Sequence, residues 1–397
     1  MLITPRHTKY RKLISQKVNQ ISPSGIRRFF DLLASMEEVI SLGVGEPDYA
    51  TPWHICEAAI SSLEKGHTMY TSNLGMPELR QELSRYLKDT YNLAYDADSE
   101  LLITVGVSEG LDLAMRAIIN PGDEVIMPDP CYVSYPPCVI LAGGTPVMVA
   151  TYQKNNFEIG AADIEARITS RTKAILIGYP ANPTGAVLSQ DKLAQIAEVA
   201  RRHQLLVISD EIYAKLVYGV GHTCVASLPE MKERTILLGG FSKAYAMTGW
   251  RIGYAAASRE IIAAMTKIHQ YTMLCASIMA QVAAIAALKS GETSTTGMVK
   301  DYNRRRLVIV KGLNDIGLPC FEPHGAFYAF PSIKGTGMTS EKFAERLLIE
   351  EKVAVVPGSA FGQYGEGYVR CCYATSLVDI EEALSRMKRF VAKHRAK

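Results

Sequence analysis

Short apolar runs separated by longer stretches of helical periodicity fill most of residues 49–289. The runs are of a length typical of buried strands, while residues 111–119 and 192–202 carry apolar positions at helical spacing. Strands alternating with helices indicate an α/β fold, in which a mostly parallel sheet has helices on both faces. The predicted strands are residues 101–105, 124–127, 146–149, 174–177, 205–209, 236–238 and 252–256.

The two ends of the chain have different patterns. Residues 1–20 are polar and basic, and we expect an arm or irregular lead-in. Ser22-Pro23-Ser24 then resembles a cap before an amphipathic helix. A short strand at 39–42 and a loop at 43–48 follow. The apolar face of that helix would carry Ile26, Phe29, Phe30 and Leu33.

The C-terminal part mixes strands and helices. Residues 291–298 are small and polar, which predicts a crossing between two lobes. We therefore predict an arm with part of a small domain (1–48), a large domain (49–290) and a smaller α+β domain (291–397). The elements predicted in the last part are helices at 299–313 and 377–393 and strands at 326–330, 353–356 and 368–372.

Composition narrows the class of protein. The 397 residues are 48% hydrophobic and 21% charged, which is ordinary for a globular protein. The net charge is +3 with scattered basic residues, so no nucleic-acid footprint is predicted. The eight cysteines lack metal-ligand or disulfide spacing, which favours reduced thiols in a cytoplasmic protein and no metal site. Neither a leader pattern nor an apolar stretch of membrane-spanning length is evident, so we expect neither secretion nor membrane insertion.

Lys243 is the first candidate for chemistry. It follows the apolar run 235–238 and lies between Ser242 and Arg251 in a glycine-rich segment. Burial disfavours a charged ammonium, and a neutral lysine amine forms Schiff bases with carbonyls. The serine hydroxyl and the arginine fork suit a phosphate, so a phosphorylated aldehyde is a matching ligand. The alternative is a surface lysine with no role.

Two further clusters follow predicted strands. Asp210 could hold the protonated ring nitrogen of a cofactor, and Tyr213 could donate to an oxygen on the same ring; a helix N-cap is the alternative for the aspartate. Asn182 lies in an Asn-Pro-Thr-Gly sequence that ends at Gly185, where the proline biases its backbone away from helix. The alternative is a plain turn, since such clusters are common in turns.

Four more candidates complete the set. The segment 104–110 leads into a helix whose N-terminus suits a phosphate, although a tight turn would look the same. Arg370, inside an apolar strand, could grip a carboxylate or form a structural salt bridge. Tyr132 could stack on a planar ring or belong to the core. Tyr70 could reach a phosphate, either in its own chain or across a dimer interface.

In combination these motifs are specific. Ser242-Lys243 followed by Gly249-Trp-Arg251-Ile-Gly253, together with Asp210, Tyr213, Asn182-Pro-Thr-Gly185 and Arg370, resembles the class I/II aminotransferases. These are fold-type-I enzymes that depend on pyridoxal 5'-phosphate (PLP), and the resemblance covers about residues 22–390. It implies the PLP-dependent transferase fold and a homodimer with sites at the subunit interface.

The resemblance also implies a role for each position. Lys243 would form a Schiff base with PLP and move a proton from the substrate Cα, in a ping-pong transfer from an L-amino acid to a 2-oxo acid. Asp210 would pair with the ring nitrogen. Arg370 would clamp the α-carboxylate, and the Gly45 backbone would close over the substrate. The remaining cofactor contacts would be Asn182 and Tyr213 at the ring oxygen, Tyr132 on the ring, and Val107, Ser108, Ser242, Arg251 and the neighbouring subunit's Tyr70 at the phosphate.

Substrate preference is the open point. Some aspartate-preferring members carry a lysine at the position of Ser108, whereas segments 128–135, 247–250 and 365–370 look more like the branch with aromatic and acetyl-diaminopimelate aminotransferases. We expect aromatic or broad donors with 2-oxoglutarate and glutamate; aspartate or N-acetyl-diaminopimelate is the alternative. A PLP-dependent carbon-sulfur β-lyase or decarboxylase is a rival. A non-enzymatic sensor is disfavoured, because about 20 residues before the resemblance are too few for a DNA-binding module.

Overall fold

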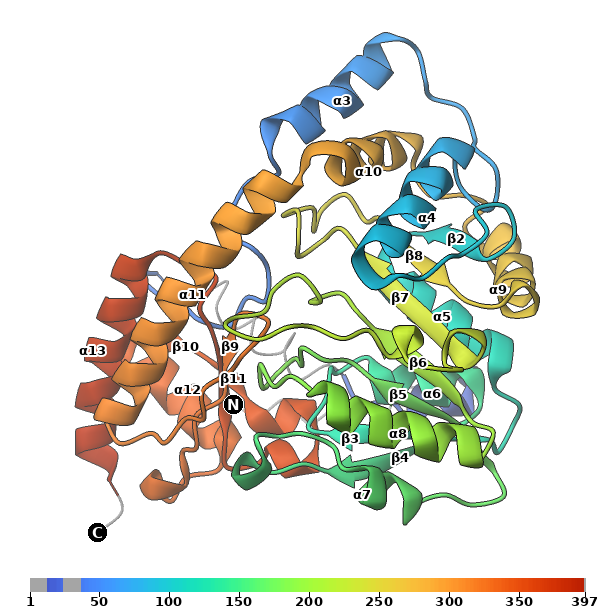
Figure 1. Ribbon diagram of the computed structural model, residues 1–397. Coiled ribbons are helices and arrows are strands. Elements are labelled where there is room, and N and C mark those ends of the chain that lie inside the picture. The colour runs from blue at the N-terminus through green and yellow to red at the C-terminus, as the bar shows by residue number, and fades with distance from the viewer. Residues whose placement is uncertain (1–12, 24–36, 396–397) are drawn as a thin grey trace.

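A seven-stranded sheet forms the centre of the larger part of the molecule (Figure 1). The computed structural model describes residues 13–23 and 37–395. Five strands pair in parallel, and β8 pairs antiparallel with both of its neighbours. The predicted α/β class with a mostly parallel sheet is confirmed. The strand order is β2 (Leu101–Thr104), β8 (Gly253–Ala256), β7 (Thr235–Gly240), β6 (Leu206–Asp210), β5 (Thr172–Ile177), β3 (Glu124–Asp129) and β4 (Thr145–Ala150).

Both faces of this sheet are buried, which explains the continuous apolar runs in the sequence. In β5, Ala174 and Leu176 pack on one face while Ile175 and Ile177 pack on the other. In Figure 1, α8 lies in front of the sheet and α5 behind it. The helices around the sheet are α3 (Trp53–Glu64), α4 (Pro77–Tyr91), α5 (Gly106–Ile118), α6 (Tyr135–Ala142), α7 (Ala161–Glu165), α8 (Gln190–Arg202), α9 (Arg259–Thr272) and α10 (Ile278–Ser290).

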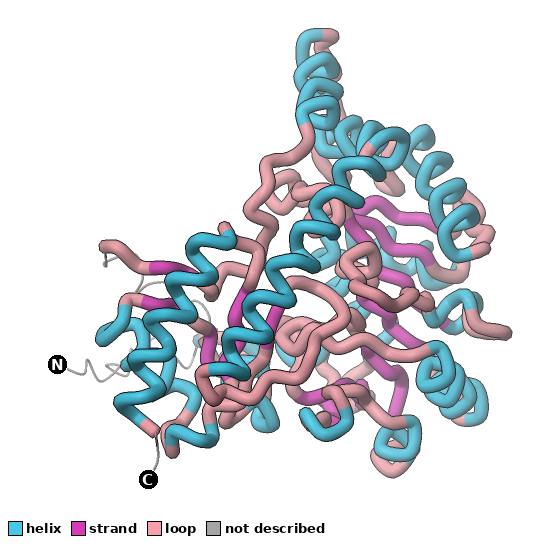
Figure 2. The backbone as a smooth tube through the Cα atoms, turned by 60° about the vertical axis from the view of Figure 1, so that its left-hand side comes forward, coloured by secondary structure: helices cyan, strands magenta, loops and turns pink. Residues whose placement is uncertain are grey.

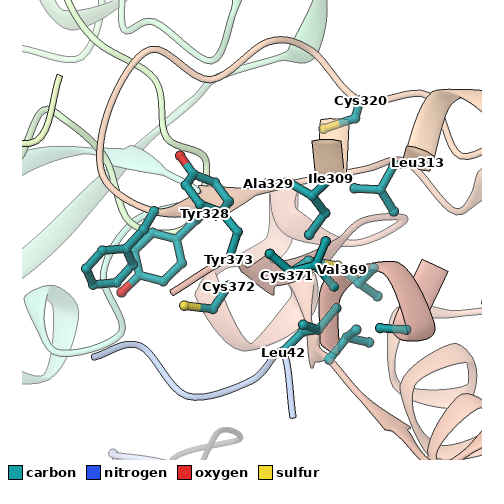
Figure 3. Close-up of a cluster of buried hydrophobic side chains, with 14 of the residues drawn as sticks. Leu42, Ile309, Leu313, Cys320, Tyr328, Ala329, Val369, Cys371, Cys372 and Tyr373 are labelled. Carbon is teal, nitrogen blue, oxygen red and sulfur yellow. The ribbon is translucent and has the colours of Figure 1, made fainter. Parts of the chain in front are cut away.

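A second core belongs to smaller sheets and three long helices. One sheet is antiparallel, in the order β11 (Val356–Pro357), β12 (Val369–Cys372), β9 (Tyr328–Ala329), and β1 (Ile40–Ser41) pairs in parallel with β10 (Val353–Ala354). Figure 3 shows Leu42, from the N-terminal segment, with Val369 and Cys371 of β12 in this core. The helices are α11 (Glu292–Asp315), α12 (Ser340–Glu351) and α13 (Leu377–His394), of which α11 and α13 lie along the outside (Figure 2).

The predicted helix 299–313 begins too late. The segment 291–298, predicted only as a crossing between two lobes, belongs to α11, which is helical from Glu292 onward. Thr295 and Met298 are buried, and the Thr295 hydroxyl donates to the Ala244 carbonyl at 2.7 Å. These tertiary contacts outweigh the low helix propensity of glycine and threonine. The long helix thus runs without interruption from the larger part of the molecule into the smaller one (Figure 2).

Other differences are smaller. Helix α5 begins at Gly106, before the predicted 111–119, and the predicted strand 353–356 divides into β10 and β11, which pair with different partners. A four-residue helix, α1 (Gln16–Asn19), lies in the predicted arm. The helix expected to carry Ile26, Phe29, Phe30 and Leu33 lies outside the described residues, and the domain boundaries at 48 and 290 stay predictions. Within the described residues, no helix has the length and apolarity needed to cross a membrane.

Candidate active site

A cavity of about 320 Å³ lies at one edge of the large sheet. Strands β2, β3, β5, β6 and β7 end at this edge, where ligands of open α/β sheets bind. Strand β8 runs the opposite way, so the residues that precede it lie at the same edge. The lining includes eleven of the twelve predicted site residues: Gly45, Val107, Ser108, Tyr132, Asn182, Asp210, Tyr213, Ser242, Lys243, Arg251 and Arg370.

Lys243 lies three residues beyond the end of β7. Its Nζ donates a hydrogen bond to the Gly45 carbonyl at 2.7 Å. Burial lowers the pKa of Lys243 to about 8, and the positive charges of Arg370 and Arg251 act in the same direction, while Glu46 opposes them. The neutral amine, which a nucleophile or proton acceptor requires, is therefore far more abundant near physiological pH than in an ordinary lysine, although it is still the minor form.

Asp210 ends β6 and lies on the cavity floor. Its Oδ2 accepts from the Tyr135 hydroxyl at 2.8 Å, and its Oδ1 accepts from the Ile212 backbone N–H at 3.1 Å. Burial raises the pKa of Asp210 to about 6, and these two hydrogen bonds act in the opposite direction. A Cβ at Gly178 would lie 2.1 Å from the Tyr135 hydroxyl oxygen, so a glycine is needed for tyrosine to reach the carboxylate. The site thus holds a carboxylate suited to a cationic partner.

The start of α5 forms a cradle for an anion. Gly106 has a φ of +75°, which glycine adopts without strain. The backbone N–H groups of Val107 and Ser108 lie in the first helical turn, where they have no intrahelical acceptor. Arg251 completes the cradle: a Cβ at Gly106 would lie 2.8 Å from its Nη2. Free N–H groups, a helix dipole and a guanidinium are together suited to a phosphate.

Arg370 approaches the cavity from β12. Its Nη1 donates to Asn182 Oδ1 at 2.9 Å, and its Nη2 donates to the Gly43 carbonyl at 2.6 Å. Its buried Nε has no hydrogen-bond partner within the described structure. The guanidinium also lies 4.5 Å from the Tyr328 ring centroid. Arg370 has no ion-pair partner among the described residues that line the cavity, so it can bind a carboxylate from outside the chain.

Two lining tyrosines were not identified from the sequence. Tyr135 contacts Asp210, and the Tyr328 hydroxyl lies 2.7 Å from that of Tyr213. Burial raises the pKa of Tyr213 well above its usual value. A tyrosine inside an apolar run is a sequence signal for a buried hydroxyl that needs a partner. The partner itself could not be read from the sequence.

Tyr70 is the one predicted site residue outside this cavity. Its side chain is 83% exposed. Tyr271 and Met69 are also strongly exposed, and the Asn73 amide donates to the Leu274 carbonyl at 2.7 Å, which joins the two segments. Tyr70 therefore contributes nothing to the site of its own chain in this structure. Its predicted role across a subunit interface stays a prediction.

Comparison with known proteins agrees with the geometry of the site. A family model described as aminotransferase class I and II matches residues 37–387. The chain belongs to this family. It is therefore an aminotransferase, and like other class I and II aminotransferases it depends on PLP.

Relatives of this aminotransferase match nearly its whole length. A putative aminotransferase, YugH of Bacillus subtilis, is 58% identical and aligns over 96% of this chain and 98% of its own. An aspartate aminotransferase of Pyrococcus abyssi is 47% identical over 95% and 97% of the two chains. The solved aromatic aminotransferase of Pyrococcus horikoshii has a TM-score of 0.88 and 45% identity over 92% of this chain and 99% of its own.

The residues present fit PLP. The cofactor carries a phosphate, an aldehyde and a ring nitrogen, and the cavity offers the Gly106 cradle with Arg251, the partly neutral Lys243 and the buried Asp210 carboxylate. The hydrogen bonds that Asp210 accepts from the Tyr135 hydroxyl and the Ile212 N–H come from neutral donors, so neither neutralises the negative charge that would face the ring nitrogen. Among the described residues, no cluster of His, Cys, Asp or Glu suits a metal ion.

Proposed function

We propose that this aminotransferase uses aromatic or a broad range of L-amino acids as donors, with 2-oxoglutarate and glutamate as the second pair. The observation that carries this proposal is the charge of the cavity lining, in which the only basic side chains among described residues are Lys243, Arg251 and Arg370. Those three are assigned to the cofactor and the α-carboxylate. No cation of the described lining is dedicated to a second carboxylate. A dicarboxylic substrate, 2-oxoglutarate and glutamate included, therefore gains no extra ion pair, and aspartate has no advantage over an aromatic donor.

Each site residue has a proposed task. When bound, PLP supplies an aldehyde for amine exchange and a protonated ring that accepts electrons from the substrate Cα. Arg370 binds the α-carboxylate, with the Gly45 backbone beside it. Lys243, once free, takes the Cα proton and returns it, since its pKa of about 8 permits both directions. The residues that would hold PLP are Lys243, Asp210, Asn182, Tyr213, Tyr132, Val107, Ser108, Ser242 and Arg251.

The relatives leave the donor open. An aspartate aminotransferase of P. abyssi is 47% identical, an aromatic-amino-acid aminotransferase of Thermococcus litoralis 44%, and a probable N-acetyl-LL-diaminopimelate aminotransferase of B. subtilis 43%. Aspartate or N-acetyl-diaminopimelate is thus the second candidate donor. A carbon-sulfur β-lyase has no specific support in the cavity.

We expect tyrosine and phenylalanine to exceed aspartate in kcat/KM, in parallel assays with 2-oxoglutarate that also include N-acetyl-diaminopimelate. Ser108→Lys would add the missing cation and raise kcat/KM for aspartate relative to phenylalanine by about tenfold or more. Ser108→Gln, similar in length but uncharged, is the matched control and should not produce this change. Aspartate as the best donor of the unaltered enzyme would overturn the proposal.

We further propose a cytoplasmic homodimer in which Tyr70 serves the phosphate of the neighbouring subunit. The exposed side chains of Met69, Tyr70 and Tyr271 support a subunit contact at this surface, because large apolar groups are seldom gathered in water. The eight cysteines are all free thiols, which suits a reducing compartment.

Mixed subunits test the dimer. Lys243→Ala and Tyr70→Ala chains, each weakly active or inactive alone, should regain activity when they are unfolded and refolded together. A hybrid with shared sites has one site carrying both changes and one site carrying neither. Mixing without recovery, or an active monomer in gel filtration, would contradict the proposed role of Tyr70.

A further inference from the structure

Tyr328, in β9, is a buried tyrosine at the wall of the cavity, with 1% of its surface exposed. Figure 3 shows it on one side of the smaller core. A buried phenol hydroxyl needs a hydrogen-bond partner. That of Tyr328 lies 2.7 Å from the hydroxyl of Tyr213, and either oxygen can be the donor. The direction of this hydrogen bond decides where the proton of Tyr213 points.

The space around the Tyr328 hydroxyl is closely filled. A Cβ at Gly45 would lie 2.6 Å from the hydroxyl oxygen, so that glycine permits the segment 43–46 to pass over the ring edge. The Gly45 carbonyl accepts the hydrogen bond of Lys243. Tyr328 is thus held between the segment that contacts Lys243 and the hydroxyl of Tyr213, with little freedom to turn away.

The ring of Tyr328 has a second contact. The Arg370 guanidinium carbon lies 4.5 Å from its centroid and 4.9 Å from that of Phe361. Both distances are within the range of cation–π attraction. The two aromatic rings therefore support the guanidinium while its Nη atoms bind Asn182 and Gly43. Tyr328 thus contacts both Arg370, the proposed carboxylate clamp, and Tyr213, the proposed donor to the cofactor ring oxygen.

We propose that Tyr328 is a positioning residue: its hydroxyl donates to Tyr213, which leaves the Tyr213 proton for the cofactor, and its ring holds Arg370 in place. The proposal rests on the roles proposed above for Tyr213 and Arg370. A hydroxyl that accepts a hydrogen bond becomes a stronger donor itself. Tyr328 therefore strengthens the hydrogen bond that stabilises a negative ring oxygen, through Tyr213 and without contacting the cofactor.

The test is the pH titration of the visible absorption band of the PLP-loaded enzyme. Tyr328→Phe removes the hydroxyl and keeps the ring, so the midpoint should rise by about 0.3 to 0.7 pH units. The KM for the donor amino acid should stay within about twofold, because the ring still supports Arg370. Tyr328→Leu removes the ring as well, and KM should rise by about tenfold.

A double-mutant cycle tests the role of Tyr328 separately from the role proposed for Tyr213. Tyr213→Phe alone should raise the midpoint more than Tyr328→Phe does, and adding Tyr328→Phe to it should cause no further shift. Tyr373→Phe, a buried tyrosine of the same core that donates to the Ala326 carbonyl at 3.3 Å, is the control and should leave the midpoint unchanged.

Three results would overturn the inference, and they differ in what they remove. If Tyr213→Phe shifts the midpoint and Tyr328→Phe does not, the role of Tyr328 fails alone. If Tyr328→Phe has its full effect in the absence of the Tyr213 hydroxyl, it acts by another route and the inference fails. If neither variant moves the midpoint, the role proposed for Tyr213 fails as well.

Discussion

Lys243→Ala is expected to lower turnover by at least about four orders of magnitude, because in the proposed mechanism this one side chain supplies both the covalent attachment and the proton transfer. No other lysine lines the cavity among the described residues, so no neighbour can replace it. The loss of turnover is measured in single half-reactions, in which the formation of the 2-oxo acid is followed. Borohydride reduction followed by peptide mass spectrometry should find PLP covalently attached to Lys243 in the unaltered enzyme and no covalently attached PLP in the variant.

The matched control for this prediction is Lys215→Ala. The Lys215 side chain is only 17% exposed and forms an ion pair with Glu292, yet it does not line the cavity. Its loss should leave PLP attachment intact. Attachment in the unaltered chain should quicken as pH rises, with a midpoint at about 8 and a plateau above it, because only the neutral amine attacks and burial lowers the pKa of Lys243 to about 8. A Lys243→Ala variant that retains turnover and attached PLP would contradict the assignment.

The large sheet could be predicted because both of its faces are buried. Residues such as Ala174 and Ile175 point to opposite faces and are all apolar, so each strand reads as an uninterrupted run. The start of α11 could not be predicted in the same way. Its first turns contain Thr295 and Gly297, which have low helix propensity, and it is stabilised by contacts with distant residues such as Ala244.

The candidate site likewise contains residues that could be predicted from the sequence and residues that could not. Asp210, Asn182 and Lys243 each follow an apolar strand, so their convergence could be inferred from one rule about parallel sheets. Tyr135 and Tyr328 come from a helix start and from a separate small sheet. Their hydroxyls reach the site only through the arrangement of the two parts of the molecule, which no local pattern encodes. The sequence also did not show that glycines such as Gly178 leave the space for these hydroxyls.

Asp210 joins these observations, since its behaviour depends on residues that the sequence did not reveal. Burial alone would keep its carboxyl neutral over a wide pH range, because it raises the pKa to about 6 even with two hydrogen bonds to the charged form. Tyr135 supplies one of them and Gly178 leaves the space for it. A cationic ring nitrogen beside the carboxylate would add to the effect of these hydrogen bonds and lower the pKa of Asp210. The negative carboxylate would in turn favour the protonated ring nitrogen.

Asp210→Asn is therefore expected to reduce kcat by about 10²- to 10³-fold or more while PLP remains attached to Lys243. Asparagine has nearly the same shape and can still accept from the Ile212 N–H, but it has no negative charge to keep the ring nitrogen protonated. The phosphate cradle with Ser242 and Arg251 is unchanged, so the PLP content after gel filtration should match that of the unaltered enzyme.

Tyr135→Phe gives the graded comparison for this last prediction. It removes one hydrogen bond that lowers the pKa of Asp210, so that pKa rises and the carboxyl takes up a proton at a higher pH. Activity should then fall at a higher pH on the acid side of the profile, while the rate at neutral or alkaline pH changes little. In Asp210→Asn the rate should be low across the whole profile, because no pH restores the charge. Near-normal kcat in Asp210→Asn with full PLP content would show that the ring nitrogen does not need this carboxylate.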